Sequence, residues 1–405
     1  MNAPHESKAF VAAQDILPGV RALADEMVAI RHHIHAHPEL AFEEHATGDL
    51  LAARLAEWGY EVHRGLGGTG VVGTLRRGSG PKRVGLRADM DALPIQESTG
   101  LPYASRHAGK MHACGHDGHT AVLLAAARHL AQDGHFDGTL HLIFQPAEEG
   151  LGGGRKMVED GLFERFPCDA IFALHNLPGM PAGHFGFRAG AFMPSSDTVI
   201  VTVRGRGGHG SAPHLSADPV VAAAHIIVAL QTVVSRNVDP REMAVISVGA
   251  IHGGEAPNVI PDKVEMKLTV RAFRPATREM LRQRITELVQ AQAQTLGVQA
   301  DVDYQWRYPA LINDEACTAF ARQVALDWLG PERVPAQIEP LTGSEDFSFM
   351  LQERPGCYFV VGNGVGEHHH TGGCSVHNPG YDFNDAILPV AASYWVQLVQ
   401  RFLAP

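Results

Sequence analysis

Residues 111–120 hold the densest group of potential metal ligands in the sequence. They read MHACGHDGHT, with one cysteine, three histidines and one aspartate around two glycines. Cys114 and His116 offer a thiolate and an imidazole two residues apart, and Gly115 and Gly118 let the backbone turn so that both side chains reach one point. Buried cysteines and structural histidines are common, so this segment alone leaves metal binding open.

Two pairs of carboxylates follow short apolar segments. Asp89 and Asp91 are spaced at i and i+2, which puts them on one side of an extended chain, where an aspartate orients a metal-bound imidazole or caps a helix. Glu148 and Glu149 are adjacent and face different directions. One of them can therefore bind a metal ion while the other takes a proton from water that the ion acidifies. A solvated acidic turn is the alternative interpretation of this pair.

Two further histidines complete a possible ligand set. His175 follows the apolar run 170–174, and His377 lies far downstream in the segment VHNPG. Together with Cys114, His116 and Glu149 they offer sulfur, nitrogen and oxygen donors, enough for two divalent ions if one ligand bridges. Zinc suits this mixture best, and manganese, cobalt and nickel are the alternatives.

The elements that would position these residues alternate between helices and strands. Apolar residues recur at helical spacing in residues 25–34 and 47–58, and five short apolar runs occur at residues 70–75, 83–86, 139–144, 170–174 and 358–361. This alternation predicts an α/β fold with a sheet flanked by helices. The reactive side chains follow the runs, which is where an open α/β sheet carries its site.

The pattern changes between residues 193 and 305. Strands are expected at 198–203, 244–248, 264–272 and 298–304, and helices at 219–236 and 277–294. This β-α-β-β-α-β order is typical of a ferredoxin-like α+β domain. We therefore predict a discontinuous catalytic domain, residues 1–192 and 306–405, with an inserted domain at 193–305. Asp218 is the expected N-cap of the first inserted helix.

Length and composition restrict the class of protein. The chain has 405 residues, 45% of them hydrophobic and 19% charged, which fits a soluble protein of two domains. The net charge of −11 disfavours nucleic acid as a partner. Neither a signal peptide nor an uninterrupted apolar run of membrane-spanning length is evident, so we expect no membrane association and a cytoplasmic location. Five irregularly spaced cysteines form no disulfide framework, and the run 368–370 of three histidines is expected to be a solvated loop.

Three polar residues stand out in the predicted inserted domain. The glycine-rich segment 205–214 (GRGGHGSAPH) exposes His209, and the segment 256–261 (APNVIP) carries Asn258. Arg271 lies within an otherwise apolar strand, where its guanidinium is costly unless it is paired. Its partner is either a structural carboxylate or the carboxylate of a substrate, which a guanidinium binds in a bidentate fork.

Seven ordered motifs across nearly the whole chain resemble the hippurate hydrolase and auxin-conjugate hydrolase branch of the dinuclear-metal aminoacylase and carboxypeptidase superfamily. The motifs lie at residues 35–40 (HAHPEL), 87–94 (RADMDALP), 114–119 (CGHDGH), 146–150 (PAEEG), 209–214 (HGSAPH), 343–347 (GSEDF) and 377–381 (HNPGY). The resemblance implies two metal ions, with Cys114 as the bridging ligand. The implied metal ligands are Cys114, His116, Glu149, His175 and His377.

The resemblance also implies roles for residues around the metal ions. Glu148 is the implied general base that activates water and then protonates the leaving amine, and Asp91 is implied to orient a ligand. Asp89 occupies the position at which more distant members of the superfamily have a histidine ligand. His112 and His119 are expected to support the loop and the following helix rather than to bind metal.

The implied substrate contacts lie mostly in the inserted domain. His209 and Asn258 match residues at the scissile carbonyl, and His209 usually comes from the partner subunit, which implies a homodimer. Arg271 matches the arginine that holds the carboxylate of the amino acid. A pocket-lining loop is matched by Gly343, Ser344 and Glu345.

We therefore expect a metal-dependent amidohydrolase that cleaves small N-acyl amino acids into a carboxylic acid and a free amino acid. The alternatives are a dipeptidase or carboxypeptidase of the same superfamily and an amidase in which His116 activates Cys114 as the nucleophile. A zinc-dependent nucleobase deaminase is disfavoured because no Pro-Cys-x-x-Cys segment occurs. A non-catalytic metal-binding protein is disfavoured because it would give Glu148 no purpose.

Overall fold

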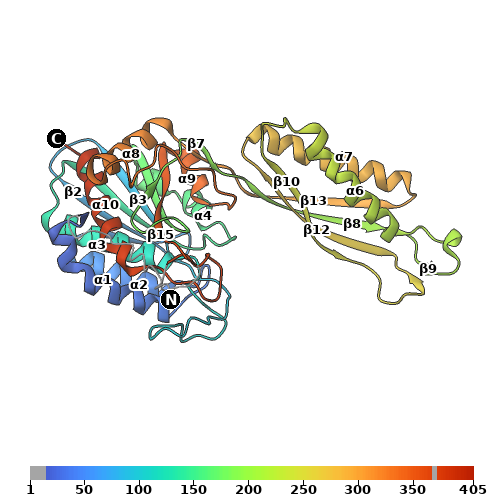
Figure 1. Ribbon diagram of the computed structural model, residues 1–405, viewed down its shortest axis with the longest axis horizontal. Coiled ribbons are helices and arrows are strands. Elements are labelled where there is room, and N and C mark those ends of the chain that lie inside the picture. The colour runs from blue at the N-terminus through green and yellow to red at the C-terminus, as the bar shows by residue number, and fades with distance from the viewer. Residues whose placement is uncertain (1–14, 367–371) are drawn as a thin grey trace, which may run out of the picture. The chain divides into compact units, whose positions relative to one another are not determined.

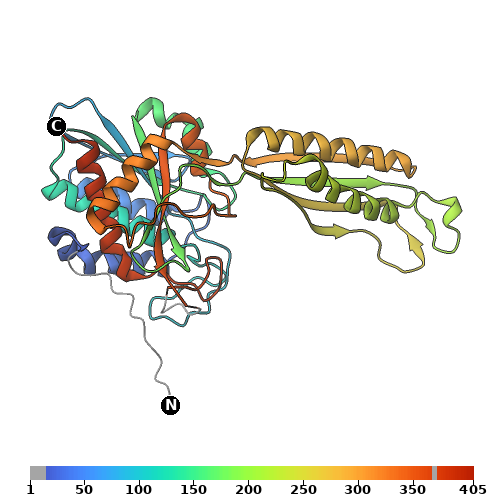
Figure 2. The same cartoon turned by 45° about the horizontal axis from the view of Figure 1, so that its top comes forward.

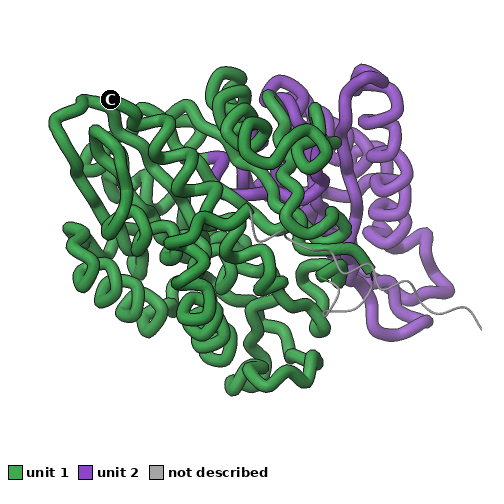
Figure 3. Tube along the Cα trace, turned by 60° about the vertical axis from the view of Figure 1, so that its left-hand side comes forward, with its two compact units in different colours: residues 1–190, 313–339, 349–405 green, residues 191–312, 340–348 purple. Residues whose placement is uncertain are grey.

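The computed structural model describes residues 15–366 and 372–405, so the run of three histidines at 368–370 lies outside the described residues. The chain forms two compact units (Figure 3). Unit 1 comprises Met1–Gly190, Asn313–Glu339 and Phe349–Pro405, and unit 2 comprises Ala191–Ile312 and Pro340–Ser348. The predicted boundaries at 192/193 and 305/306 lie two and seven residues from the observed crossings. The segment 340–348, which we had placed in the catalytic domain, belongs to unit 2.

A seven-stranded mixed sheet forms the centre of unit 1, in the order β1-β2-β4-β3-β5-β15-β6. Strands β3, β4, β5 and β15 run parallel to one another, whereas β1, β2 and β6 pair antiparallel with their neighbours. The carboxyl ends of the four parallel strands therefore meet at one edge of the sheet. The strands are β1 (Glu61–Leu66), β2 (Gly70–Arg77), β3 (Arg83–Asp89), β4 (Gly138–Gln145), β5 (Ala170–Pro178), β6 (Phe185–Gly186) and β15 (Gly356–Gly364).

Helices flank this sheet, and three of them, α1, α3 and α10, pack side by side (Figure 1). Helix α3 is buried on nearly every side and α10 is almost wholly apolar and buried, because both lie in the main core of the unit. The helices are α1 (Pro18–Ala36), α2 (His45–Glu57), α3 (His116–Asp133), α4 (Gly153–Glu159), α5 (Leu162–Arg165), α8 (Glu315–Leu329), α9 (Phe347–Glu353) and α10 (Leu388–Phe402).

Unit 2 is a four-stranded antiparallel sheet covered on one face by α6 and α7 (Figure 2). Its sheet order, β10-β12-β8-β13, together with the β-α-β-β-α-β chain order, confirms the predicted ferredoxin-like arrangement. The elements are β8 (Ser196–Arg204), α6 (Pro219–Asn237), β10 (Ala244–His252), β12 (Lys263–Ala272), α7 (Pro275–Thr295) and β13 (Gln299–Tyr308), with a separate short antiparallel pair, β9 (Gly208–His209) and β11 (Val259–Ile260). The chain passes from unit 1 to unit 2 at β7 (Gly190–Met193) and returns at β14 (Leu311–Asn313), and it enters unit 2 again for residues 340–348.

Helix α6 begins where the sequence predicts, after Asp218 and at Pro219. The Asp218 side chain accepts hydrogen bonds from the amides of Val220 and Val221, as expected of an N-cap, and Pro219 occupies the first turn. By length and composition alone the helix could cross a membrane, with a mean hydropathy of 1.5, although polar residues interrupt its apolar run. In the structure Ile226 and Leu230 pack into the core of unit 2.

Candidate metal centre

The loop that carries Cys114 is shaped by Gly115, whose backbone conformation and close neighbours disfavour any side chain. Gly115 precedes α3 with a φ of +100°, and a Cβ atom added there would lie 2.2 Å from the side-chain oxygen of Asn176 and 2.5 Å from the hydroxyl of Tyr381. The loop is also tied to the His377 segment, because the amide of His377 donates a hydrogen bond of 2.7 Å to the carbonyl of Ala113. Cys114 and His377, far apart in sequence, are thereby held together.

The structure brings together the five residues predicted as metal ligands. The Sγ atom of Cys114 lies 3.4 Å from Nε2 of His175, and Nε2 of His377 lies 3.1 Å from Oε1 of Glu149. One ligand atom each from Cys114, His116 and Glu149 lies within 4.8 Å of the other two. His175 does not follow its strand as predicted, because β5 continues to Pro178 and places it within the strand.

The donor atoms of this cluster fit divalent metal ions. Nδ1 of His116 lies 2.9 Å from the carbonyl of Asp91 and 3.1 Å from its carboxylate, so this nitrogen carries the proton. Nδ1 of His175 likewise donates to the carbonyl of Asn176. Nε2 of His175 faces the Cys114 thiol, and Nε2 of His116 is buried with no hydrogen-bond partner among the described residues, 3.7 Å from Oδ2 of Asp89. Burial would lower the pKa of His116, but Asp89 and Cys114 raise it well above its usual value, and a bound cation would take the place of the proton on Nε2. A buried acceptor of this kind beside a thiol and a carboxylate suits a bound cation.

Asp91 also positions a second member of the cluster. Its Oδ2 atom accepts a hydrogen bond of 3.0 Å from the amide of Glu149, while its Oδ1 faces His116. Asp91 is itself almost fully buried. One carboxylate therefore fixes both an imidazole and the backbone of the adjacent glutamate, which agrees with an orienting role.

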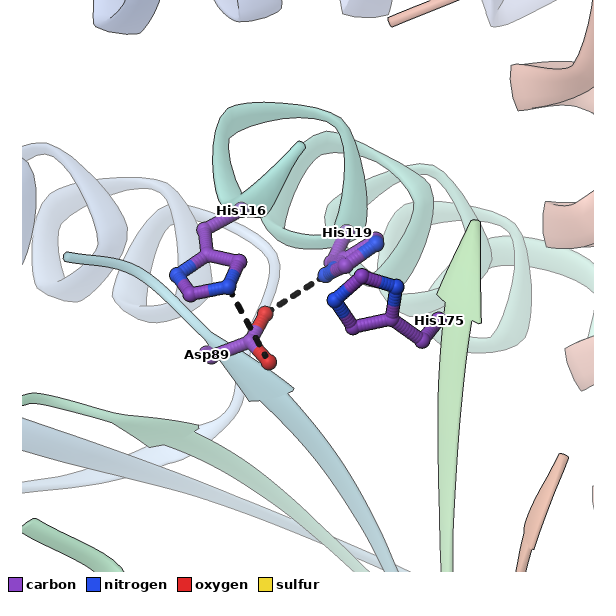
Figure 4. Close-up of side chains that lie close together, drawn as sticks. All are labelled: Asp89, His116, His119 and His175. Atoms are coloured by element: carbon purple, nitrogen blue, oxygen red, sulfur yellow. Dashed lines mark hydrogen bonds and ion pairs between the residues drawn. The ribbon is translucent and has the colours of Figure 1, made fainter. Parts of the chain in front are cut away.

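Asp89 and His119 form a buried pair beside the cluster (Figure 4). Nδ1 of His119 lies 2.6 Å from Oδ1 of Asp89, and Nε2 of His119 accepts a hydrogen bond of 3.0 Å from the amide of Asn176. Donor atoms of Asp89, His116, His119 and His175 all lie within 4.8 Å of one another, so this group could also hold an ion. Both ring nitrogens of His119 nevertheless form hydrogen bonds within the protein. This agrees with a role in supporting the loop and the helix rather than in binding metal.

Burial and neighbouring charges shift the pKa values of several residues in the site. Burial opposes the charge on Asp89, but His116 and Arg87 hold its pKa well below the usual range for a carboxyl group. Burial lowers the pKa of His175, and the neighbouring His119 lowers it further. Burial and the charge of Glu149 raise the pKa of the Cys114 thiol. A divalent cation at this point would favour the thiolate and the neutral imidazoles.

Glu148, the predicted base, lies in the turn that follows β4. It is 7% exposed and is preceded by Ala147, a non-glycine residue with a φ of +53°. Glu149, next in the chain, belongs to the ligand cluster. Glu149 thus belongs to the metal cluster, and Glu148 is its neighbour in the chain; its role as the base stays a prediction.

His209 and Asn258 share one surface hollow in unit 2, because His209 on β9 pairs with Val259 on β11. The amide of Ser211 donates a hydrogen bond of 3.1 Å to Nδ1 of His209, and the Ser211 hydroxyl lies 2.8 Å from the same nitrogen. A neutral His209 therefore carries its proton on Nε2. This exposed N–H is available to an acceptor on a substrate.

The other predicted substrate residues lie elsewhere in unit 2. Arg271 on β12 is half-buried, and its Nη1 atom is buried without a hydrogen-bond partner among the described residues. Burial lowers the pKa of its guanidinium, and the charge of Asp197 opposes that shift. Gly343 and Ser344 are at least partly exposed, whereas Glu345 is buried and accepts a hydrogen bond from the amide of Phe347.

A buried ionic network, which the sequence did not reveal, anchors the start of α3. Asp117 contacts Nδ1 of His35 at 2.9 Å and Nη1 of Arg31 at 3.3 Å, and Nε2 of His35 faces Glu97 at 3.4 Å. Burial alone would lower the pKa of His35, but these carboxylates raise it to about 9. The motif HAHPEL therefore contributes a cationic imidazole that fixes the residue next to His116.

The charge on His35 should make stability depend on pH. Because the pKa of His35 rises from 6.5 unfolded to about 9 folded, its contribution to the free energy of unfolding is fully present below pH 6.5 and disappears as pH rises through 9. The difference in stability between the wild type and His35→Gln, measured by urea unfolding across this range, should therefore shrink with rising pH. A difference independent of pH would contradict a charged His35.

Comparisons with known proteins define first the class and then the family. The crystal structure of a Bacillus subtilis dinuclear metal binding peptidase from the M20 family matches with a TM-score of 0.80 and 33% identity, over 95% of this chain and 99% of that chain. The fold and the metal cluster thus define a hydrolase of amide bonds. The model of peptidase family M20/M25/M40 matches residues 85–401, and the chain belongs to this family.

Curated relatives match nearly the whole chain, among them two that are named for a substrate. A hippurate hydrolase of Campylobacter jejuni is 44% identical over 389 residues, which cover 96% of this chain and 100% of the relative. An N-acetyl-L-cysteine deacetylase of Bacillus subtilis is 37% identical over 385 residues, 94% of this chain and 89% of the relative. The predicted family, the fold class and the assignment as a metal-dependent amidohydrolase are confirmed.

Proposed function

We propose that this protein hydrolyses N-acyl amino acids with two divalent metal ions held by Cys114, His116, Glu149, His175 and His377. The observation that carries the proposal is the convergence of these five donors, one of which, Glu149, directly follows Glu148 in the chain. The relatives named for hippurate and N-acetyl-L-cysteine both cleave an amide between an acyl group and an amino acid, which supports the substrate class.

The residues of the chain divide the chemical work. The bound ions would acidify a water molecule and polarise the scissile carbonyl. Glu148, which directly precedes the ligand Glu149 in the chain, would take the proton of that water and pass it to the leaving amine. His209 would donate from Nε2 to the carbonyl oxygen as negative charge develops there, with Asn258 beside it in the same hollow.

The free carboxylate of an N-acyl amino acid would be bound by a cationic side chain. The buried, unpaired Nη1 atom of Arg271 supports a role in binding the substrate carboxylate, since a buried guanidinium nitrogen without a partner is costly until an anion satisfies it. Gly343, Ser344 and Glu345 would line the pocket for the rest of the substrate. Zinc is the proposed metal, because thiolate and imidazole are the ligands that it favours.

A homodimer through unit 2 is the proposed assembly. Val220, Val221 and Val228 on α6 are 42%, 48% and 71% exposed, and β10 forms a sheet edge beside this helix. Exposed apolar side chains next to an open sheet edge favour association with a second copy. A cytoplasmic location is proposed with it, because Cys114 and the other cysteines are free, as metal binding by a thiolate requires.

Mixing two inactive variants tests whether His209 acts across the dimer. Glu148→Gln and His209→Ala should each be inactive alone, but a heterodimer contains one site with Glu148 from one subunit and His209 from the other. An equimolar mixture, denatured and refolded together, should recover about a quarter of the wild-type activity. Recovery no greater than the sum of the two separate variants would contradict action in trans.

A substrate panel tests the proposed function itself. The metal-loaded protein should release free amino acid from N-benzoyl and N-acetyl amino acids, measured with an amine-reactive dye, and should act poorly on the corresponding amino-acid amides that lack a free carboxylate. Dipeptides in the same panel examine the dipeptidase alternative. Faster hydrolysis of dipeptides than of every N-acyl amino acid would overturn the proposal in favour of a peptidase.

A further inference from the structure

The turn that carries Glu148 is fixed by the buried carboxylate of Glu44, which is not part of any of the sequence motifs. Oε1 of Glu44 accepts a hydrogen bond of 2.9 Å from the amide of Ala147, and Oε2 of Glu44 accepts one of 2.6 Å from the hydroxyl of Thr69. The Glu44 side chain is fully buried, so it cannot touch a substrate in solution. It contacts the backbone directly before the proposed base.

The geometry of Ala147 shows why such a contact is needed. Its φ of +53° is unfavourable for an alanine, and a residue holds this conformation only when its surroundings enforce it. The amide of Ala147 is held by Glu44, and its carbonyl accepts a hydrogen bond of 2.9 Å from the amide of Gly153. Two residues further on, the amide of Glu149 is held by Asp91. Buried carboxylates thus hold the amides on both sides of Glu148.

Glu44 has no comparable role in its own helix. It occupies the position before α2, but its side chain makes no capping hydrogen bond there. Glu39 caps this helix instead, accepting hydrogen bonds of 2.9 Å from the amides of Ala46 and Thr47. Burial raises the pKa of Glu44, which means that its ionised form is disfavoured at this place. Glu44 is fully buried, does not cap α2 and forms a hydrogen bond to a turn distant in sequence, so we infer that its function lies at that turn.

We propose that Glu44 is a positioning residue for Glu148: it fixes the left-handed turn at Ala147 and thereby aims the base at its water. The inference rests on the proposed function of Glu148. Thr69 contributes by holding the second oxygen of Glu44, which brings the loop between β1 and β2 into the same contact. Glutamine at position 44 can make both contacts, since its oxygen accepts from Ala147 and its amide donates to Thr69.

Three substitutions test this role. Glu44→Met leaves the buried amide of Ala147 without a partner and should lower kcat about 10- to 100-fold with little change in KM and in bound metal. Glu44→Gln should restore kcat to within about threefold of the wild type, because it keeps both hydrogen bonds. Glu43→Met is the matched control, because the neighbouring Glu43 is exposed and, among the described residues, its carboxylate pairs with Lys110 at the surface. It should leave kcat and KM unchanged.

Amide hydrogen exchange provides a readout that does not depend on turnover. The amide of Ala147 should exchange faster in Glu44→Met than in the wild type and in Glu44→Gln, whereas the core strands should exchange at unchanged rates. This result can be obtained even if the wild type hydrolyses none of the N-acyl amino acids, so failure of the proposed function is distinguishable from failure of this inference.

Either of two results would overturn the inference. The first is unchanged kcat or unchanged exchange at Ala147 in folded Glu44→Met. The second is a loss of metal that parallels the loss of activity, because Glu44 would then act through the ligand Glu149 rather than through Glu148. If Glu44→Met fails to fold, Thr69→Val replaces it: removal of the hydroxyl should lower kcat about two- to fivefold, and an unchanged kcat would overturn the inference.

Discussion

Turnover of N-acyl amino acids is expected to fall about 100- to 10,000-fold when Glu148 is replaced by glutamine. The substitution keeps the size of the side chain and removes its capacity to accept a proton. Because Glu148 is not one of the five proposed metal ligands, Glu148→Gln should hold as much metal as the wild type. Steady-state kinetics and elemental analysis of the same preparation would measure both quantities.

The neighbouring glutamate supplies the matched control for this experiment. Glu149→Gln changes the same atoms one position along the chain, but Glu149 lies in the metal cluster. Its loss of activity should be accompanied by loss of metal. Substantial turnover in fully metal-loaded Glu148→Gln would show that another group takes the proton, and our account of the base would be wrong.

Replacement of Cys114 by alanine is the second change with a large expected effect. Cys114 is buried, and its Sγ atom lies 3.4 Å from Nε2 of His175. Its loss should reduce bound metal and lower turnover by about 100-fold or more, because the ions supply the nucleophilic water. Cys317→Ala is the control, because it removes a free cysteine on α8 that is not a member of the metal cluster. It should leave bound metal and turnover unchanged.

The same variant separates the metal enzyme from a thiol amidase. If Cys114 were the nucleophile, a chelator would leave the wild type active. In a metal enzyme a chelator abolishes activity, and added metal restores it in the wild type but restores it poorly in Cys114→Ala. Full activity of the wild type after chelation, together with complete inactivity of Cys114→Ala under all conditions, would favour the thiol mechanism.

Local patterns in the sequence were sufficient to predict most of the framework of the site. The apolar runs before Asp89 and Glu148 correspond to β3 and β4, which run parallel and deliver both segments to one edge of the sheet. The ferredoxin-like order of unit 2 followed from alternating and helical periodicities in the same way. Such patterns are local, so a single sequence contains them.

Contacts between distant segments were not predictable from the sequence. Glu44 and Ala147 are 103 residues apart, and nothing in either segment indicates that they meet. The pairing of His119 with Asp89 and that of His35 with Asp117 depend in the same way on how β3, α1 and α3 pack. The extension of β5 past His175 was missed because Asn176 is polar, although its side chain is buried and bonded to Tyr381.

Titration of the metal-free protein with zinc, followed by the rate of hydrolysis of N-benzoylglycine, tests the central claim most directly. The account predicts no hydrolysis without metal and a rate that rises to a plateau at two zinc ions per chain, with the same stoichiometry in a direct binding measurement. Hydrolysis by the metal-free protein, or zinc binding at two ions per chain with no hydrolysis of any N-acyl amino acid, would contradict it.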